Sequence, residues 1–184
     1  MSFHAEFGED EFLFSRYPDF FRTPGFYVDV GAGHISMNSN SHWLRELGWR
    51  GLNIDGNKDW QHDWPTGALI HAVISNRPEV HFESHPCKEL SRVAEIQPNT
   101  KAITLEYILE AHHVDGIGFL SVDAEGHEFE VIQSMDLEKH RPTFIISEYA
   151  TYGIGEDFRV MDYLCANGYE VIHRTTANFV YKSL

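Results

Sequence analysis

The sequence predicts a doubly wound, Rossmann-like α/β fold whose sheet is mostly parallel and ends in an antiparallel hairpin strand. Three observations lead to this fold class. Short β-branched or aromatic runs alternate repeatedly with capped helical segments. Parallel strands need crossover connections, which place helices on both faces of the sheet. The chain closes with two strand-like runs, at 169–174 and 178–183, whose short separation indicates a hairpin.

The expected strands are runs of β-branched and aromatic residues bounded by glycine, proline or polar residues. Before the hairpin they cover 26–32, 51–55, 68–75, 117–123 and 143–149. The expected helices have polar N-caps, apolar faces, or a glycine or proline after the last turn. They cover a segment around Trp43 to Leu47, then 57–64, a segment after Thr104, 127–135 and 156–167. In the last helix we expect Phe158, Met161, Leu164 and Cys165 to face inward.

The length and the composition indicate one globular domain. The 184 residues contain no repeat, low-complexity tract or linker, so we expect a single domain over 1–184, with residues 1–24 as a helical N-terminal extension. There are 28 acidic and 14 basic residues, a net charge of −14, and the basic residues are scattered. This pattern argues against a nucleic-acid partner.

The compartment is predicted from what the sequence lacks. No apolar run is long enough to span a membrane, and residues 1–12 do not resemble a signal peptide. The two cysteines, Cys87 and Cys165, lie far apart and form no CxxC pair, which fits a reducing compartment. We therefore expect a cytoplasmic protein without a membrane partner, and the sequence does not predict its oligomeric state.

Candidate functional residues lie where the expected strands end. In doubly wound sheets, ligands bind at the carboxyl ends of the strands, near the point where the strand order reverses. The residues at these ends are Asp29 to Gly33, Asp55, Ser75, Asp123 to His127, and Glu148.

A glycine turn and a later carboxylate indicate an adenosine-type ligand. Gly31 and Gly33 follow the first strand, where they allow a sharp turn and close approach of a ligand. Asp55 ends the second strand, where a carboxylate can accept both ribose hydroxyls. The alternative is a purely structural role, in which the glycines only tighten a strand-to-helix connection. The combination with Asp55 favours ligand binding.

S-adenosylmethionine (SAM) is the adenosine cofactor that fits best. A dinucleotide fingerprint needs a third glycine, but Ser36 stands there, and no Tyr-x-x-x-Lys pair or P-loop occurs. SAM needs a ribose carboxylate and a glycine turn for its amino-acid arm, but no pyrophosphate site. We include Ser75, at the end of the third expected strand, among the cofactor-binding candidates.

Two blocks of sequence resemble the FkbM family of SAM-dependent methyltransferases. GFYVDVGAGHISMNSNSHWLRELGWRGLNIDGN (25–57) resembles the opening of these enzymes, and FLSVDAEGHEFEVIQSMDLEKHRPTFIISE (119–148) is similar to their second signature. EFGEDEFL (6–13) resembles the segment before the domain. The resemblance implies a class I methyltransferase fold, with SAM contacting Asp29, Gly31, Gly33 and Asp55. It also implies transfer to hydroxyl groups, often of sugars.

The expected chemistry assigns catalytic roles to Asp123, Glu125, His127 and Glu148. Methyl transfer to a hydroxyl needs a base that removes the proton. Asp123 is one candidate, and His127 with a carboxylate partner is the other. The structural alternative is that Asp123 only caps a helix whose first turn contains Glu128 and Glu130.

Several alternatives stay open at this point. We assign no metal ligand, although a divalent ion between Asp123 and Glu148 is a second hypothesis. His81, Glu83, His85 and Cys87 could share one face of a strand, but a solvated edge is favoured there. We expect the acceptor to be a small molecule or glycan. The rival functions are a catalytically silent nucleoside-binding module and, less favoured, an NAD-dependent oxidoreductase.

Overall fold

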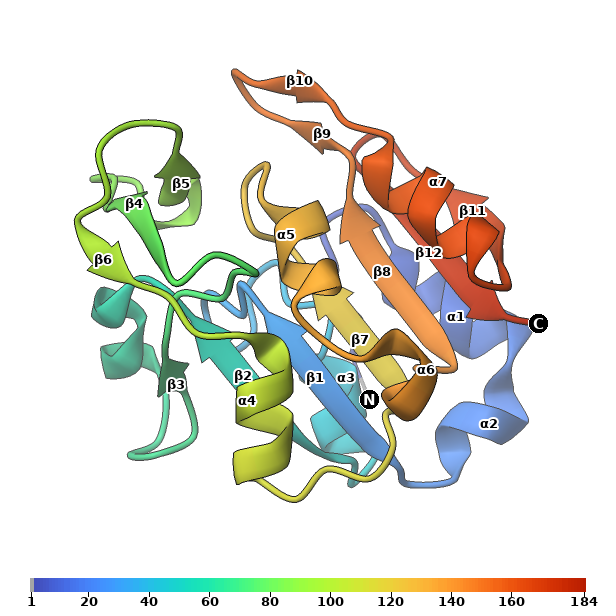
Figure 1. Cartoon of the computed structure of the whole chain (residues 1–184). Coiled ribbons are helices and arrows are strands. Elements are labelled where there is room, and N and C mark those ends of the chain that lie inside the picture. The colour runs from blue at the N-terminus through green and yellow to red at the C-terminus, as the bar shows by residue number, and fades with distance from the viewer. Residues whose placement is uncertain (1) are drawn as a thin grey trace.

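The computed structural model describes residues 2–184 and is built around a seven-stranded sheet (Figure 1). The strand order is β11-β12-β8-β7-β1-β2-β3. The sheet contains β1 (Phe26–Val30), β2 (Arg50–Asp55), β3 (Ile70–His71), β7 (Phe119–Val122), β8 (Phe144–Glu148), β11 (Tyr169–Arg174) and β12 (Asn178–Ser183). Neighbouring strands from β3 to β8 are parallel, and β12 is antiparallel to both β8 and β11. The predicted fold class is confirmed.

The strand order reverses beside β1. After β1 the chain moves outward through β2 and β3, and it then returns to form β7 on the other side of β1. The connection that leaves β1 runs to β2 on one side, and the connection that leaves β7 runs to β8 on the other side. A crevice at the carboxyl ends of β1 and β7 is therefore the expected ligand site.

Helices cover both faces of the sheet, because side chains alternate along each strand. On β1, Tyr27 packs with an aromatic cluster on one face, whereas Val28 and Val30 join the larger cluster on the other face. The aromatic face is covered by α1 (Glu9–Arg16), α2 (Pro18–Arg22) and α3 (His42–Glu46). The other face is covered by α4 (Leu105–Ala111), α5 (Glu128–Gln133), α6 (Leu137–His140) and α7 (Arg159–Ala166).

Two smaller sheets stand at the carboxyl end of the large sheet (Figure 1). One has the order β5-β4-β6, from β4 (Glu79–Glu83), β5 (Arg92–Ala94) and β6 (Thr100–Lys101), with the 3₁₀ helix η2 (Lys88–Leu90) between β4 and β5. The other is a hairpin of β9 (Ala150–Thr151) and β10 (Gly155–Glu156). Across residues 2–184, the structure has no helix with the length and apolar character needed to cross a bilayer.

Three predicted elements differ from the structure. The expected strand at 68–75 pairs with β2 only at Ile70–His71, because β2 ends at Asp55 and the chain then bridges to Ile103 instead. The expected helix at 57–64 is the 3₁₀ helix η1 (Lys58–Asp63). The expected helix at 156–167 begins only at Arg159, after the β9–β10 hairpin has used Glu156.

The predicted inward face of this last helix is partly wrong. Leu164 is buried and Met161 packs against the core, but Cys165 is exposed. Phe158 is 36% exposed and precedes the helix, where its ring stacks on Tyr149. With the shorter helix, Val160 and Leu164 supply the buried side chains.

Candidate functional site

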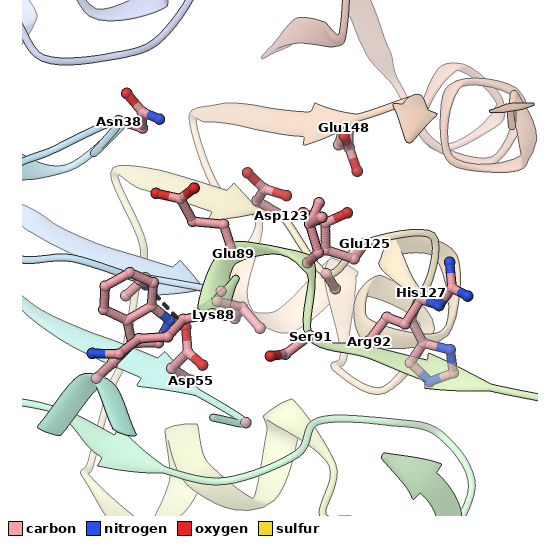
Figure 2. Close-up of a pocket in the computed structure, with 18 of the residues that line it drawn as sticks. Asn38, Asp55, Lys88, Glu89, Ser91, Arg92, Asp123, Glu125, His127 and Glu148 are labelled. Carbon is pink, nitrogen blue, oxygen red and sulfur yellow. Dashed lines mark hydrogen bonds between the residues drawn. The ribbon is translucent and has the colours of Figure 1, made fainter. Parts of the chain in front are cut away.

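A cavity of about 480 Å³ opens where β1, β2, β7 and β8 end. Figure 2 shows Asp55 on one side of it, Asp123 and Glu125 further along, and Glu148 on the strand beyond. The segment between β4 and β5 contributes Glu89 and Ser91 to its lining, and the first residue of β5, Arg92, also lines it. The cavity therefore lies at the predicted reversal of the strand order.

The turn after β1 requires glycine at position 31. The Gly31 and Ala32 N–H groups both donate to the Ile54 carbonyl, at 2.9 and 3.1 Å, and this turns the chain over the end of β2. Gly31 has a φ of +78°, and a Cβ there would lie 1.6 Å from the Asp123 carbonyl oxygen. Any side chain would push β1 and β7 apart at the cavity.

Asp55 is fixed by backbone donors on both carboxylate oxygens. Oδ2 accepts from the Gly33 N–H at 2.9 Å, and Oδ1 accepts from the Asn57 N–H at 2.7 Å. Asp55 is 8% exposed, and its burial raises the pKa to about 6. Each oxygen keeps a further lone pair, so the carboxylate can still accept hydrogen bonds from a ligand.

The Asp55 side of the cavity has flat and apolar walls. Trp60 from η1, Val73 after β3 and Phe82 from β4 all line it. Around Gly33, an added Cβ would meet nothing closer than 3.9 Å, so this backbone has open space beside it. A carboxylate, an open glycine turn and apolar walls together suit a nucleoside.

A compact group of three carboxylates occupies the other side. Oxygens of Asp123, Glu128 and Glu148 lie within 4.8 Å of one another. Asp123 and Glu148 meet because they end the adjacent parallel strands β7 and β8. Glu128, in the first turn of α5, accepts from the Ala124 and Gly126 N–H groups at 2.8 and 3.1 Å.

The pKa values of these carboxyl groups are raised, first because burial disfavours their charged forms. The pKa of Glu128 is raised to about 7 and that of Glu148 to about 8, where neighbouring carboxylates add to the effect. The pKa of Asp123 is also well above its ordinary value, through burial and then repulsion from Glu148 and Glu125. Proton-accepting groups with pKa values near neutrality suit acid–base chemistry.

His127 also lines the cavity, but both of its ring nitrogens face protein partners. Nε2 is 3.0 Å from Ser75 Oγ, and Nδ1 is 3.6 Å from Glu130 Oε2. Burial lowers the pKa of this histidine. These contacts make His127 a less available base than Asp123, whose carboxylate receives no hydrogen bond within residues 2–184.

The structure brings most of the predicted site residues together. The cavity is lined by Gly31, Gly33, Asp55, Asp123, Glu125, His127 and Glu148. The lining does not include Asp29, which is buried on the α3 side of the sheet and accepts from Ser41 Oγ at 2.5 Å. Ser75 is fully buried behind His127 and is also outside the lining. The structure therefore gives these two residues supporting positions.

Several residues in the cavity lining, or next to it as Glu128 is, were missed by the sequence reasoning. Glu128 was interpreted only as a charge at a helix N-terminus, although its spacing from Asp123 was a usable signal. Phe82 and the η2 segment lie between the two blocks, 25–57 and 119–148, that resemble the family. Glu6, Phe7 and Tyr152 come from the N-terminal segment and the β9–β10 hairpin, and no local pattern points to a site in either.

Only one group of side chains in residues 2–184 is arranged for a metal ion, and it is the one formed by Asp123, Glu128 and Glu148. Its carboxylate oxygens are the hard ligands that Mg²⁺ or Ca²⁺ prefers. His81 and Glu83 make a pair at 3.8 Å but gather no further ligand. The favoured interpretation of that strand as a solvated edge is wrong, because β4 is the middle strand of the order β5-β4-β6.

Comparison with known proteins gives one match. A model of a protein family described as the methyltransferase FkbM domain matches residues 29–171. No match was found among curated proteins or among solved structures.

Proposed function

The chain belongs to the FkbM methyltransferase family, and from this premise we propose that it transfers the methyl group of SAM to a hydroxyl of a carbohydrate or similar small molecule. One observation supports this most strongly. A single cavity joins the Asp55 and Gly33 pair to the carboxylates of Asp123 and Glu148. The first pair suits a nucleoside and the second suits proton removal from an acceptor.

The residues on the Asp55 side fit SAM. The Asp55 carboxylate would accept the ribose hydroxyls, and the flat walls formed by Trp60 and Phe82 would contact the adenine. The open backbone at Gly33 leaves room for the amino-acid arm. When bound, SAM supplies a methyl group on a positively charged sulfur, which becomes a neutral thioether when that methyl group leaves.

The residues on the other side would prepare the acceptor. Asp123 would take the proton of the acceptor hydroxyl, so that the oxygen can accept the methyl group that SAM supplies. Burial, and then repulsion from Glu148, Glu125 and Glu128, keeps the pKa of Asp123 high, so that its carboxylate is a stronger base than usual. The walls of the cavity would orient the acceptor so that its hydroxyl oxygen faces the donor.

Ligand binding and product formation test this proposal. We expect SAM and its demethylated product to raise the melting temperature, and NAD to leave it unchanged. Radiolabelled methyl donor should then label a hydroxyl compound from a panel of sugars, sugar nucleotides and phenols. Binding without any transfer would favour the silent module, and stabilisation by NAD alone would favour the oxidoreductase. Loss of activity on chelation, with recovery on adding Mg²⁺, would assign a divalent ion to the three carboxylates.

The Asp55→Asn variant tests the cofactor end. An amide cannot accept two backbone N–H groups and a ribose diol equally well, so we expect SAM to bind roughly 10- to 100-fold more weakly. Isothermal titration of the variant against the wild type measures this change. Glu138→Asn is a suitable control, because Glu138 is exposed on α6 outside the cavity lining. Unchanged affinity in Asp55→Asn would remove this residue from the cofactor site.

A further inference from the structure

The lining of the cavity has many more acidic than basic side chains. It contains six carboxylates but only Lys88 and Arg92 as permanent cations; the carboxylates are those of Glu6, Asp55, Glu89, Asp123, Glu125 and Glu148. Burial raises the pKa of Asp123, Glu125 and Glu148, so these three carboxyl groups are partly protonated near neutral pH. The exposed Glu6 and Glu89 supply the negative charge at the edge of the acceptor space.

Both cations have partners outside the lining. Lys88 Nζ lies 3.2 Å from Asp63 Oδ2 and donates to the Asp59 carbonyl at 3.1 Å. Arg92 Nε lies 3.8 Å from Glu83 Oε2. Within the described chain, by contrast, no hydrogen bond or ion pair reaches the carboxylates of Glu6 and Glu125.

Three of the carboxylates form a looser set, which we call the mouth carboxylates: Glu6, Glu89 and Glu125. They come from the N-terminal segment, η2 and the loop after β7. Burial raises the pKa of Glu125 to about 7; nearby Arg92 lowers it, while Glu89 and Glu6 raise it further. In the described part of the chain, the mouth carboxylates do not belong to the compact group that could hold a metal ion. Their spread suits a larger cation.

Aromatic rings supply a second and independent observation. Phe7 and Tyr152 line the same cavity, although they are 39% and 83% exposed. In residues 2–184, no other ring packs against either of them. An aromatic face next to a carboxylate is the usual environment for an organic ammonium group, whereas a small hydrated metal ion gains little from such rings.

We propose that the methyl acceptor is an organic cation, a small hydroxyl compound with an ammonium group near the hydroxyl. The mouth carboxylates hold the ammonium group, and Phe7 and Tyr152 contact the carbon atoms around it. The hydroxyl then reaches Asp123, deeper in the cavity. This inference rests on the proposed function, and it narrows the acceptor to amino sugars, amino alcohols and related molecules.

A matched pair of probes tests charge separately from shape. Choline and 3,3-dimethylbutan-1-ol have the same size and the same hydroxyl, but only choline is charged. We expect choline to bind the complex of the protein with demethylated SAM roughly tenfold more tightly than its neutral isostere. Titration calorimetry or saturation-transfer NMR at millimolar probe concentration measures this without any turnover.

A double variant locates the effect. In Glu6→Gln/Glu89→Gln we expect the preference for choline to fall to less than about twofold, while the affinity for SAM stays within about twofold of the wild type. The double variant Glu138→Gln/Glu170→Gln makes the same change of charge at exposed positions outside the cavity and should keep the preference.

Four results would overturn the proposal. These are equal binding of the two probes, no detectable binding of either, an unchanged preference in Glu6→Gln/Glu89→Gln, or weaker binding of SAM instead of choline in that variant. Failure of the proposed function is distinguishable, because it would appear as no binding of SAM to the unmodified protein.

Discussion

The two ends of the cavity hold their carboxylates in different ways. At one end, the backbone N–H groups of Gly33 and Asn57 occupy one lone pair on each oxygen of Asp55. At the other end, Asp123 and Glu125 receive no such donors from residues 2–184, and their neighbours include further carboxylates. One carboxylate is stabilised by the fold, and the others are held together against their mutual repulsion.

This difference indicates which end is formed before a ligand arrives. The Asp55 end has fixed geometry, as a site for a constant cofactor requires. The Asp123 end keeps unfavourable charge that a proton, a metal ion or a cationic ligand can relieve. Burial, together with this repulsion, gives the acceptor end its proton affinity, at a cost in stability that varies with pH.

The largest effect that we expect tests the contact between the two ends. Gly31→Ala would place a Cβ 1.6 Å from the Asp123 carbonyl oxygen, in a backbone conformation that disfavours side chains. We expect a loss of more than about 4 kcal/mol in the free energy of unfolding, or no soluble protein. Gly33→Ala is the control, because its Cβ would have open space and should cost about 1 kcal/mol. Urea denaturation and soluble yield compare the two, and similar stability in both variants would contradict the tight contact.

The next effect separates the carboxylates at the acceptor end. In Asp123→Asn we expect kcat to fall roughly 10²- to 10⁴-fold, because the proton acceptor is lost while the Asp55 end still binds SAM. Glu148→Gln should cause a smaller loss, because the Glu148 carboxylate already accepts from Thr151 Oγ1 at 2.6 Å. Labelled-methyl transfer and SAM titration measure both variants. A larger loss of kcat in Glu148→Gln would exchange the two roles.

The smallest effect concerns stability and pH. The pKa values of Glu125 and Glu128 are about 7 and that of Glu148 is about 8, against an ordinary value of 4.5, so the folded protein binds these protons more tightly than the unfolded chain. This stabilisation is complete below the unfolded pKa and is lost as the pH rises through the folded values. We expect the melting temperature of the cofactor-free protein to fall by several degrees between about pH 5 and pH 8.

The Glu148→Gln variant sharpens the pH measurement. It removes the group with the highest pKa of the three, so the melting temperature should change less with pH than in the wild type. Glu106, whose pKa is lowered to about 2 mainly by hydrogen bonds from Lys139, Asp136 and His140 that outweigh its burial, titrates below this window. A steeper fall in Glu148→Gln than in the wild type would show that the raised pKa does not belong to this site.

Local patterns predicted much of the site because its key residues end strands. Gly31, Asp55, Asp123 and Glu148 each follow or close a run that the sequence marks clearly, and parallel strands bring such ends to one edge. Asp29 lies outside the cavity lining, because side chains alternate along β1 and this carboxylate points toward α3. Ser75 also lies outside the lining, because the chain predicted as a strand over 68–75 leaves the sheet after His71.

The sequence by itself determined the order of strands and helices, the glycine turn and the carboxylates that end β2, β7 and β8, because hydrophobic periodicity and turn residues are local signals. Only the tertiary structure decided that Glu6, Phe7, Glu89 and Tyr152 share one cavity with them. These residues come from segments far apart in the chain. Their meeting depends on how the N-terminal segment, the small sheet and the β9–β10 hairpin pack around the large sheet, which no local pattern encodes.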